Sequence, residues 1–307
     1  MKKIKVINET DFSWYNSFAK KIGLEQKAFE TLWRHYDQLG NQDTLTEKLM
    51  TPDYPVDDLK QSLKMLAEET NIHPYTLDLY VLFVAAKKLT VVYEDNHLSV
   101  EMFICAMKDL VYKTKECLAV HGVLGTDVFD WFPGFYRLQR FAFGRLQYDV
   151  CKFPYDTYER FGMVIDETQD AYGLHIPSSG ALDMGEVIDS LKAARSFFNK
   201  DKLIVVCHSW LFNPNHVNIL PKDSNIIKFM DLFDIIQFEP TKDFHDAWRI
   251  FGKIKGLKVA DYPEGTRLQK AYKSHLLTGG AVGPAKAVLI FDGEKILTSR
   301  SEEHETN

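Results

Sequence analysis

Residues 172–183 read Tyr-Gly-Leu-His-Ile-Pro-Ser-Ser-Gly-Ala-Leu-Asp, and they lead from a predicted strand through a loop of small residues into a helix. Asp183 and Glu186 have the spacing of a capping box, in which the first and fourth side chains satisfy each other's backbone donors. Apolar residues then recur at helical spacing, which predicts the buried face of the helix: Val187, Leu191, Ala194 and Phe198. A strand, loop and helix in this order are typical of an α/β domain.

Other segments after residue 125 extend this pattern. Residues 203–208, Leu-Ile-Val-Val-Cys-His, are apolar almost throughout and predict a strand that is buried on both faces. Residues 141–150 alternate large and polar side chains, which predicts a strand, and we expect it to pair with residues 135–139. We expect a second pair between 162–165 and 172–176. The remaining signals are two short apolar strands, 235–238 and 287–291, and two helix caps, Ser224 and Thr266.

The first 120 or so residues predict helices instead. Apolar positions between Leu24 and Leu39 recur every three or four residues, which predicts one helix that ends at Gly40. His73-Pro74 and Ser99 predict the starts of two longer helices. The fold class is therefore α+β/α/β: a helical N-terminal domain, 1–122, followed by a mixed-sheet domain, 123–300, and a polar tail, 301–307.

Composition limits the possible functions. The 307 residues carry a formal net charge of −6, with 45% hydrophobic and 26% charged residues, which excludes a disordered or collagenous chain. Arg137, Arg140 and Arg145 alternate with aromatic residues, a pattern that could stack on RNA bases, but the overall acidity argues against a nucleic-acid partner. We find no signal-peptide pattern and no membrane-spanning stretch, and so expect a cytoplasmic protein without a membrane partner. Cysteine and histidine spacings predict no metal site.

The small-residue loop has two interpretations. Free backbone N–H groups and the positive end of a helix dipole would form an anion site. The residues in question are Ile176, Ser178, Ser179, Gly180, Ala181 and Gly185. Alternatively, the loop is only a turn before a capped helix, because Asp183 places a negative charge where the anion would lie. Neither a Walker sequence nor GxGxxG occurs in the chain.

Two histidines lie at the carboxyl ends of predicted strands. His208 ends one strand and His175 ends another, and residues at the carboxyl ends of strands in α/β domains often face the ligand. Either could be a general base or a substrate-binding group, or could be structural. Cys207 and His208 are not a catalytic pair, because adjacent strand residues point to opposite faces. A hydrolase would need one of three serines as nucleophile, without a GxSxG motif to mark it: Ser178, Ser179 or Ser209.

Aromatic residues are concentrated at 129–136, Phe-Asp-Trp-Phe-Pro-Gly-Phe-Tyr. Such a cluster could line a pocket for an acyl or aromatic group, or it could be core at the junction between two domains. We favour the core.

Several phrases of the second half resemble a bacterial family of acyltransferases in which a helical N-terminal domain precedes a GNAT-like domain. The phrases are Phe143-Gly-Arg-Leu-Gln-Tyr148, His175-Ile-Pro-Ser-Ser-Gly180, Ser190-Leu-Lys-Ala-Ala-Arg-Ser-Phe-Phe198, Cys207-His-Ser-Trp-Leu211 and Ser224-Asn-Ile-Ile-Lys-Phe229. The resemblance extends over nearly the whole chain and is clearer after residue 130.

This resemblance implies a two-domain N-acyltransferase that uses acetyl-CoA or another acyl-CoA as co-substrate and acts on a small amine, with no metal. In GNAT proteins the pyrophosphate of CoA lies on backbone amides of the loop between a strand and the next helix, which here corresponds to Ile176–Gly185. The usual Arg/Gln-x-x-Gly-x-Gly/Ala pattern is absent from this loop.

The catalytic roles stay open at this point. The general base would be His175, His208 or a bridging water, and Tyr148 or Tyr172 would protonate the leaving thiolate. The main alternative is a noncatalytic GNAT-like scaffold that binds a ligand or a protein, because a fold does not imply a function. The oligomeric state is not predicted.

Overall fold

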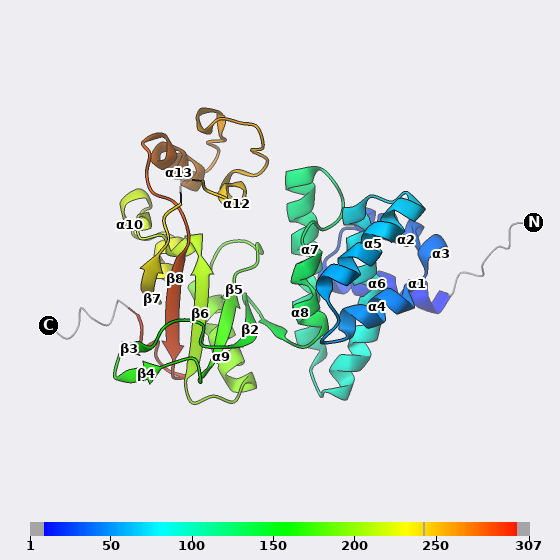
Figure 1. Cartoon of the computed structure of the whole chain (residues 1–307), viewed down its shortest axis with the longest axis horizontal. Coiled ribbons are helices and arrows are strands. Elements are labelled where there is room, and N and C mark those ends of the chain that lie inside the picture. The colour runs from blue at the N-terminus through cyan, green and yellow to red at the C-terminus, as the bar shows by residue number, and fades with distance from the viewer. Residues whose placement is uncertain (1–8, 242, 300–307) are drawn as a thin grey trace, which may run out of the picture. The chain divides into compact units, whose positions relative to one another are not determined.

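The computed structural model of the chain describes residues 9–241 and 243–299 (Figure 1). The chain divides into two units, Met1–Ala142 and Phe143–Asn307, which are described in turn. The predicted tail, 301–307, lies outside the described residues.

The first unit is helical, as its sequence predicts. Its elements are α1 (Glu9–Ile22), α2 (Gln26–Arg34), α3 (Tyr36–Leu39), α4 (Asp43–Met50), α5 (Val56–Thr70), α6 (Pro74–Asp95), α7 (Val100–His121), the 3-10 helix η1 (Phe129–Trp131) and α8 (Pro133–Tyr136). Helix α6 is central, because its residues 79–86 are all buried and a helix that is apolar all round must be enclosed by its neighbours. Helices α1, α4, α5 and α7 pack around it or against one another.

The predicted helix starts are confirmed. The His73 ring accepts the Tyr75 N–H and Pro74 occupies the first turn of α6, while the Ser99 hydroxyl accepts the Met102 N–H at the start of α7. The single helix predicted between Leu24 and Leu39 is wrong. It breaks into α2 and α3 at His35, whose N–H bonds the carbonyl of Leu32, three residues back, as in a tightened last turn.

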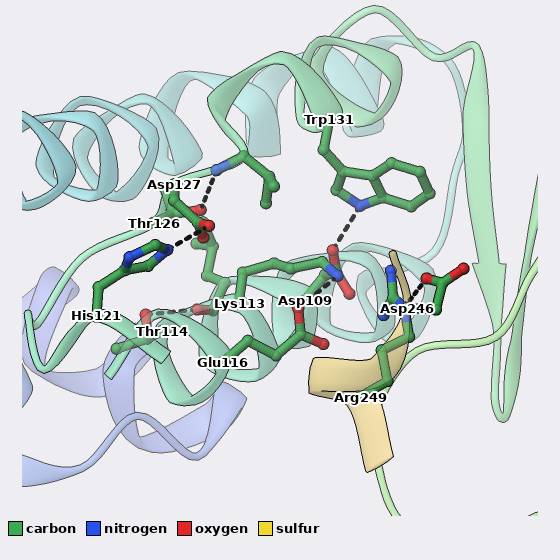
Figure 2. A network of polar contacts seen from close by, with 12 residues as sticks. Asp109, Lys113, Thr114, Glu116, His121, Thr126, Asp127, Trp131, Asp246 and Arg249 are labelled. Carbon is green, nitrogen blue, oxygen red and sulfur yellow. Dashed lines mark hydrogen bonds and ion pairs between the residues drawn. The ribbon is translucent and has the colours of Figure 1, made fainter. Parts of the chain in front are cut away.

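Residues after α7 remain attached to the helical unit through polar contacts (Figure 2). The Trp131 indole N–H donates to Oδ2 of the fully buried Asp109 of α7 at 2.7 Å. Lys113 Nζ lies 5.6 Å from the centroid of the Trp131 ring. Nearer the end of α7, His121 Nε2 lies 2.8 Å from Asp127 Oδ2. This segment is therefore tied to α7 at both ends.

The start of α6 holds the same segment from the other side. Thr76 Oγ1 donates to the Leu124 carbonyl at 2.7 Å, and the Thr126 N–H donates to the Tyr75 carbonyl at 2.9 Å. A Cβ on Gly125 would lie 2.3 Å from the Tyr75 carbonyl carbon, so only glycine fits. The aromatic cluster belongs to the helical core, as we favoured, through Phe129, Phe132, Phe135 and Tyr136. These contacts explain why the units divide after Ala142, whereas the predicted boundary follows residue 122.

The second unit is built on a mixed sheet. Its strands are β1 (Arg140–Phe143), β2 (Leu146–Lys152), β3 (Tyr158–Arg160), β4 (Met163–Ile165), β5 (Asp170–His175), β6 (Leu203–Ser209), β7 (Asp234–Phe238) and β8 (Ala285–Phe291). In the described residues, six of them form one sheet in the order β1-β2-β5-β6-β8-β7 (Figure 1), and β3 and β4 form a separate hairpin. Strands β5 and β6 pair in parallel, and α9 (Met184–Phe197) connects them.

Shorter helices follow β6. They are the 3-10 helix η2 (Trp210–Phe212), α10 (His216–Ile219), α11 (Asn225–Met230), α12 (Ala247–Phe251), the 3-10 helix η3 (Val259–Asp261) and α13 (Arg267–Leu277). Two of the predicted caps are confirmed, because Ser224 accepts the Ile227 N–H and Thr266 forms a full capping box with Gln269. The strands predicted at 203–208, 235–238 and 287–291 are β6, β7 and β8.

Three strand predictions are wrong. Residues 133–136 form α8 rather than part of a strand, because Pro133 occupies its first turn. The predicted strand 141–150 is two strands, β1 and β2, since Gly144 turns the chain with a φ of +61°. The segment at 162–165 does not pair with 172–176: β4 pairs with β3, while β5 pairs with β2 and β6.

A buried histidine is part of the small core around α10 and α13. His216 is fully buried, and its Nδ1–H donates to the Leu211 carbonyl at 3.1 Å while Nε2 accepts from the Tyr272 hydroxyl. Trp210 and Phe244 pack edge and face against Tyr272. Burial lowers the pKa of His216 from 6.5 to about 4, so the ring stays neutral in the folded protein.

We therefore expect the free energy of unfolding to fall as the pH decreases from about 6.5 toward 4. His216 takes up a proton over this range only when unfolded, and the loss amounts to about 3 kcal/mol at most. Urea denaturation at several pH values measures it. His216→Asn is the control for the carboxylates that titrate in the same range, and equal pH slopes in both proteins would contradict the assignment.

Candidate functional site

The parallel strands β5 and β6 bring the two predicted histidines to one edge of the sheet. Their ladder pairs Tyr172 with Val205 and Gly173 with Val206. The same register, continued by two residues, gives His175 and His208 equivalent positions near the carboxyl ends of the strands and on one face. Parallel strands bind ligands at this end, and here the chain leaves β5 for α9.

His175 is paired with a carboxylate. Its Nε2 lies 2.8 Å from Oδ2 of Asp149 on β2, and both side chains are about one-third exposed. A carboxylate that accepts the Nε2–H fixes the ring orientation and tautomer, and makes Nδ1 the proton-accepting atom. Asp149 was not predicted, because it lies on a strand 26 residues earlier in the chain.

His208 has a carboxylate partner as well. Its Nε2 lies 2.9 Å from Oε2 of Glu239, whose Oε1 lies 3.1 Å from Nζ of Lys286 on β8. The hydrogen bond from Lys286, with a smaller contribution from His208, holds the pKa of Glu239 below its usual value, so this carboxylate is charged at neutral pH. Tyr155 lies beside this group: its hydroxyl donates to the Cys207 carbonyl at 3.4 Å, and Lys286 Nζ is 5.8 Å from its ring centroid.

The two predicted tyrosines lie on the other face of the sheet. The fully buried Tyr148 shares a hydrogen bond of 3.1 Å with Ser190 of α9, and Tyr172 stacks on Phe198 with ring centroids 4.0 Å apart. Burial raises the pKa of both phenols. The structure thus brings His175 and His208 to one face and separates them from Tyr148 and Tyr172, which pack under the α9 segment.

The loop after His175 presents its small residues to solvent. Its exposed residues are Ser178, Ser179, Gly180 and Ala181, while Pro177 and Leu182 are buried and Ile176 is half-buried. Gly180 has a φ of +117° with open space where a Cβ would project. At the end of the loop, Asp183 Oδ1 accepts the Glu186 N–H at 3.0 Å, which is the N-cap half of the predicted capping box, and Gly185 lies in the first turn of α9.

A residue that the sequence analysis did not assign to the site holds this loop. Arg145, in the turn between β1 and β2, is buried and donates to three carbonyls of the loop. The distances are 2.9 Å to Pro177, 3.0 Å to Gly180 and 3.3 Å to Ala181. Its signal in the sequence is an arginine beside a glycine, within the segment predicted as one strand, 141–150.

Three further observations concern other kinds of site. Residues 9–241 and 243–299 contain no group of three or more side chains suited to hold a metal ion. In the same residues, no helix has the length and apolar character required to cross a bilayer. Ser209, one of the three serines considered for a hydrolase, uses its hydroxyl to accept the Leu211 N–H.

Comparisons with known proteins match both halves of the chain. Residues 15–138 match an N-acyltransferase N-terminal domain, and residues 140–289 match a GNAT-like C-terminal domain. Curated proteins give no match.

Solved structures share the fold. One is an acyltransferase in complex with decanoyl-CoA, 20% identical with a TM-score of 0.62, and the alignment covers 89% of this chain and 98% of that one. Another is an acyltransferase with decanoyl-CoA and teicoplanin, 17% identical with a TM-score of 0.60 and the same coverage.

The buried hydrogen bond between Tyr148 and Ser190 gives a prediction for stability. Tyr148→Phe leaves the buried Ser190 hydroxyl without this partner, so we expect the free energy of unfolding to fall by about 1 kcal/mol. A double-mutant cycle with Ser190→Ala, followed by urea denaturation, should show less loss in the double variant than the sum of the single losses. Additive effects would mean that the two hydroxyls do not interact.

Proposed function

We propose that this chain, which belongs to the proteins that join an N-acyltransferase N-terminal domain to a GNAT-like C-terminal domain, transfers an acyl group from acyl-CoA to an amine. The observation that carries the proposal is the sequence of features at the end of β5. A histidine paired with a carboxylate is followed directly by an exposed loop and the start of a helix. A base and an anion site are thereby adjacent.

The loop has the properties needed to bind the diphosphate of the donor. The exposed residues 178–181 precede α9, and the positive end of the helix dipole attracts anions. Gly180 allows close approach of a ligand because it has no side chain in the open space before it. Asp183 directs its carboxylate to the Glu186 N–H. The full candidate set is Ile176, Ser178, Ser179, Gly180, Ala181 and Gly185. Structural relatives crystallised with decanoyl-CoA, with CoA or with octanoyl-CoA support a donor of this class.

The residues beside the loop supply the proton transfers. An amine that attacks the thioester carbonyl must lose one proton, and the departing thiolate takes up one. We assign the first role to His175, because Asp149 orients the ring and stabilises its protonated form. His208, oriented by Glu239, is the second candidate.

A phenol on the histidine face is the better-placed proton donor. Tyr148 and Tyr172 lie on the opposite face, whereas Tyr155 lies next to the end of β6. Burial raises the pKa of Tyr155, so its hydroxyl keeps its proton at neutral pH.

We further propose a small amine as the acceptor and the cytoplasm as the location. A small amine fits the N-acyltransferase family, and one relative is described in complex with teicoplanin. All four cysteines are free thiols, which is typical of proteins in the reducing cytoplasm.

Calorimetric titration with acetyl-CoA, decanoyl-CoA and free CoA tests the proposal. We expect micromolar binding of at least one acyl-CoA, about −8 kcal/mol. Absence of heat with all three ligands at two temperatures would instead favour the noncatalytic scaffold.

The base assignment predicts unequal effects of two matched variants. His175→Asn should lower the rate of acyl transfer by a factor of about 100 or more, because the attacking amine loses its proton acceptor. His208→Asn removes an equally placed ring and should lower the rate by less than about tenfold. Decanoyl-CoA affinity is measured in both as a control for site integrity. The reverse order of effects would move the base to His208.

The loop predicts a charge effect at Gly180. Gly180→Glu should weaken decanoyl-CoA binding by about tenfold or more, because a carboxylate would face the diphosphate across open space. Gly180→Ala tests the backbone alone, since it adds the strain of a side chain at a φ of +117° without charge. Ala181→Glu adds the same charge at the next residue, where φ is not positive, and so tests the charge without this backbone strain. If neither glutamate variant changes the affinity, the diphosphate binds elsewhere.

A further inference from the structure

Arg145 is the side chain on which the conformation of the loop depends. It is 6% exposed, and its guanidinium donates to the carbonyls of Pro177, Gly180 and Ala181 from beneath the loop. The carbonyls of two consecutive residues, Gly180 and Ala181, and of Pro177 therefore point toward one cation. A planar fork of donors suits this task, because it bonds several acceptors at fixed angles.

The bonding of these carbonyls determines where the loop's N–H groups point. In a planar trans peptide, the C=O and the N–H of the same unit point in opposite directions. The carbonyls of Pro177, Gly180 and Ala181 share their peptide units with the N–H groups of Ser178, Ala181 and Leu182. Turning the three carbonyls toward Arg145 turns these three N–H groups away from its guanidinium. Two of the residues that carry these N–H groups, Ser178 and Ala181, are exposed.

From this geometry we infer that Arg145 is a positioning residue for the diphosphate of acyl-CoA. The inference rests on the proposed function. Arg145 does not touch the anion. It holds the negative ends of three peptide dipoles, so that their positive ends line the anion site together with the start of α9. Without it, the same carbonyls are free to rotate outward, and a loop that exposes carbonyl oxygens repels an anion.

The helical unit offers a matched control. Arg137 also donates to three backbone carbonyls, at 3.0 Å to Leu49, 3.1 Å to Pro52 and 2.9 Å to Tyr54. Its loss removes three hydrogen bonds of the same type from a segment that has no part in the proposed site. A purely structural role for Arg145 would therefore resemble the role of Arg137.

The experiment compares Arg145→Gln, Arg145→Lys and Arg137→Gln in the full chain by calorimetry. The two probes are decanoyl-CoA and S-decanoyl-pantetheine, which lacks the diphosphate. We expect Arg145→Gln to weaken decanoyl-CoA binding by about tenfold or more and S-decanoyl-pantetheine binding by no more than about twofold. Arg145→Lys should lie between wild type and Arg145→Gln, because an ammonium cannot bond all three carbonyls as a fork does. Arg137→Gln should leave both affinities within about twofold of wild type.

Three outcomes would overturn the inference: unchanged decanoyl-CoA binding in Arg145→Gln, an equal loss for both probes, or the same loss in Arg137→Gln. Hydrogen exchange of residues 176–183 in the ligand-free proteins separates this inference from the proposed function. We expect faster exchange in Arg145→Gln than in wild type, and unchanged exchange would contradict the role of Arg145 by itself. If the wild type binds neither probe, it is the proposed function that fails.

Discussion

The parallel pairing of β5 with β6 is the constraint on which the rest of the site depends. Two consecutive parallel strands require a crossover, and α9 supplies it. The crossover must begin at the carboxyl end of β5, which places a loop and a helix start directly after His175. The same pairing brings the end of β6, with His208, to the same edge of the sheet. One hydrogen-bonded ladder thus gathers two histidines, a loop and the positive end of a helix dipole.

Alternation along these strands then separates the residues by role. Tyr148 and Tyr172 point to the face where Ser190 and Phe198 pack, and they contribute to the core. The intervening residues point to the opposite face, where the histidines find partners on neighbouring strands. Each histidine receives its carboxylate from a different element: Asp149 from β2, and Glu239 from the end of β7. The histidine–carboxylate pairs on this face are therefore assembled across the sheet, and no single segment contains both partners of a pair.

This assembly explains how far the sequence could predict the molecule. Features set by neighbouring residues were predictable, such as the caps at Ser99, Asp183 and Thr266 and the apolar run of β6. The positions of His175 and His208 at one edge of the sheet were predictable, because each residue ends a predicted strand. Asp149, Glu239 and Arg145 were not predictable as partners, because their contacts depend on strand register and on a turn 32 to 36 residues from the loop. The aromatic segment 129–136 was predicted as core, but its attachment to α7 depends on the distant pair Asp109 and Trp131.

The contacts of Arg145 offer a physical explanation for the absence of the usual glycine-rich pattern from the loop. A glycine-rich loop can turn its amides toward an anion because its backbone is unrestricted. The present loop has one glycine at positive φ, Gly180, and a proline that restricts it further. Arg145 restricts this loop further. Three carbonyls bonded to its buried guanidinium fix the orientation of the N–H groups in the same peptide units. In the proposed acyltransferase, an interaction beneath the loop thus replaces conformational freedom within it.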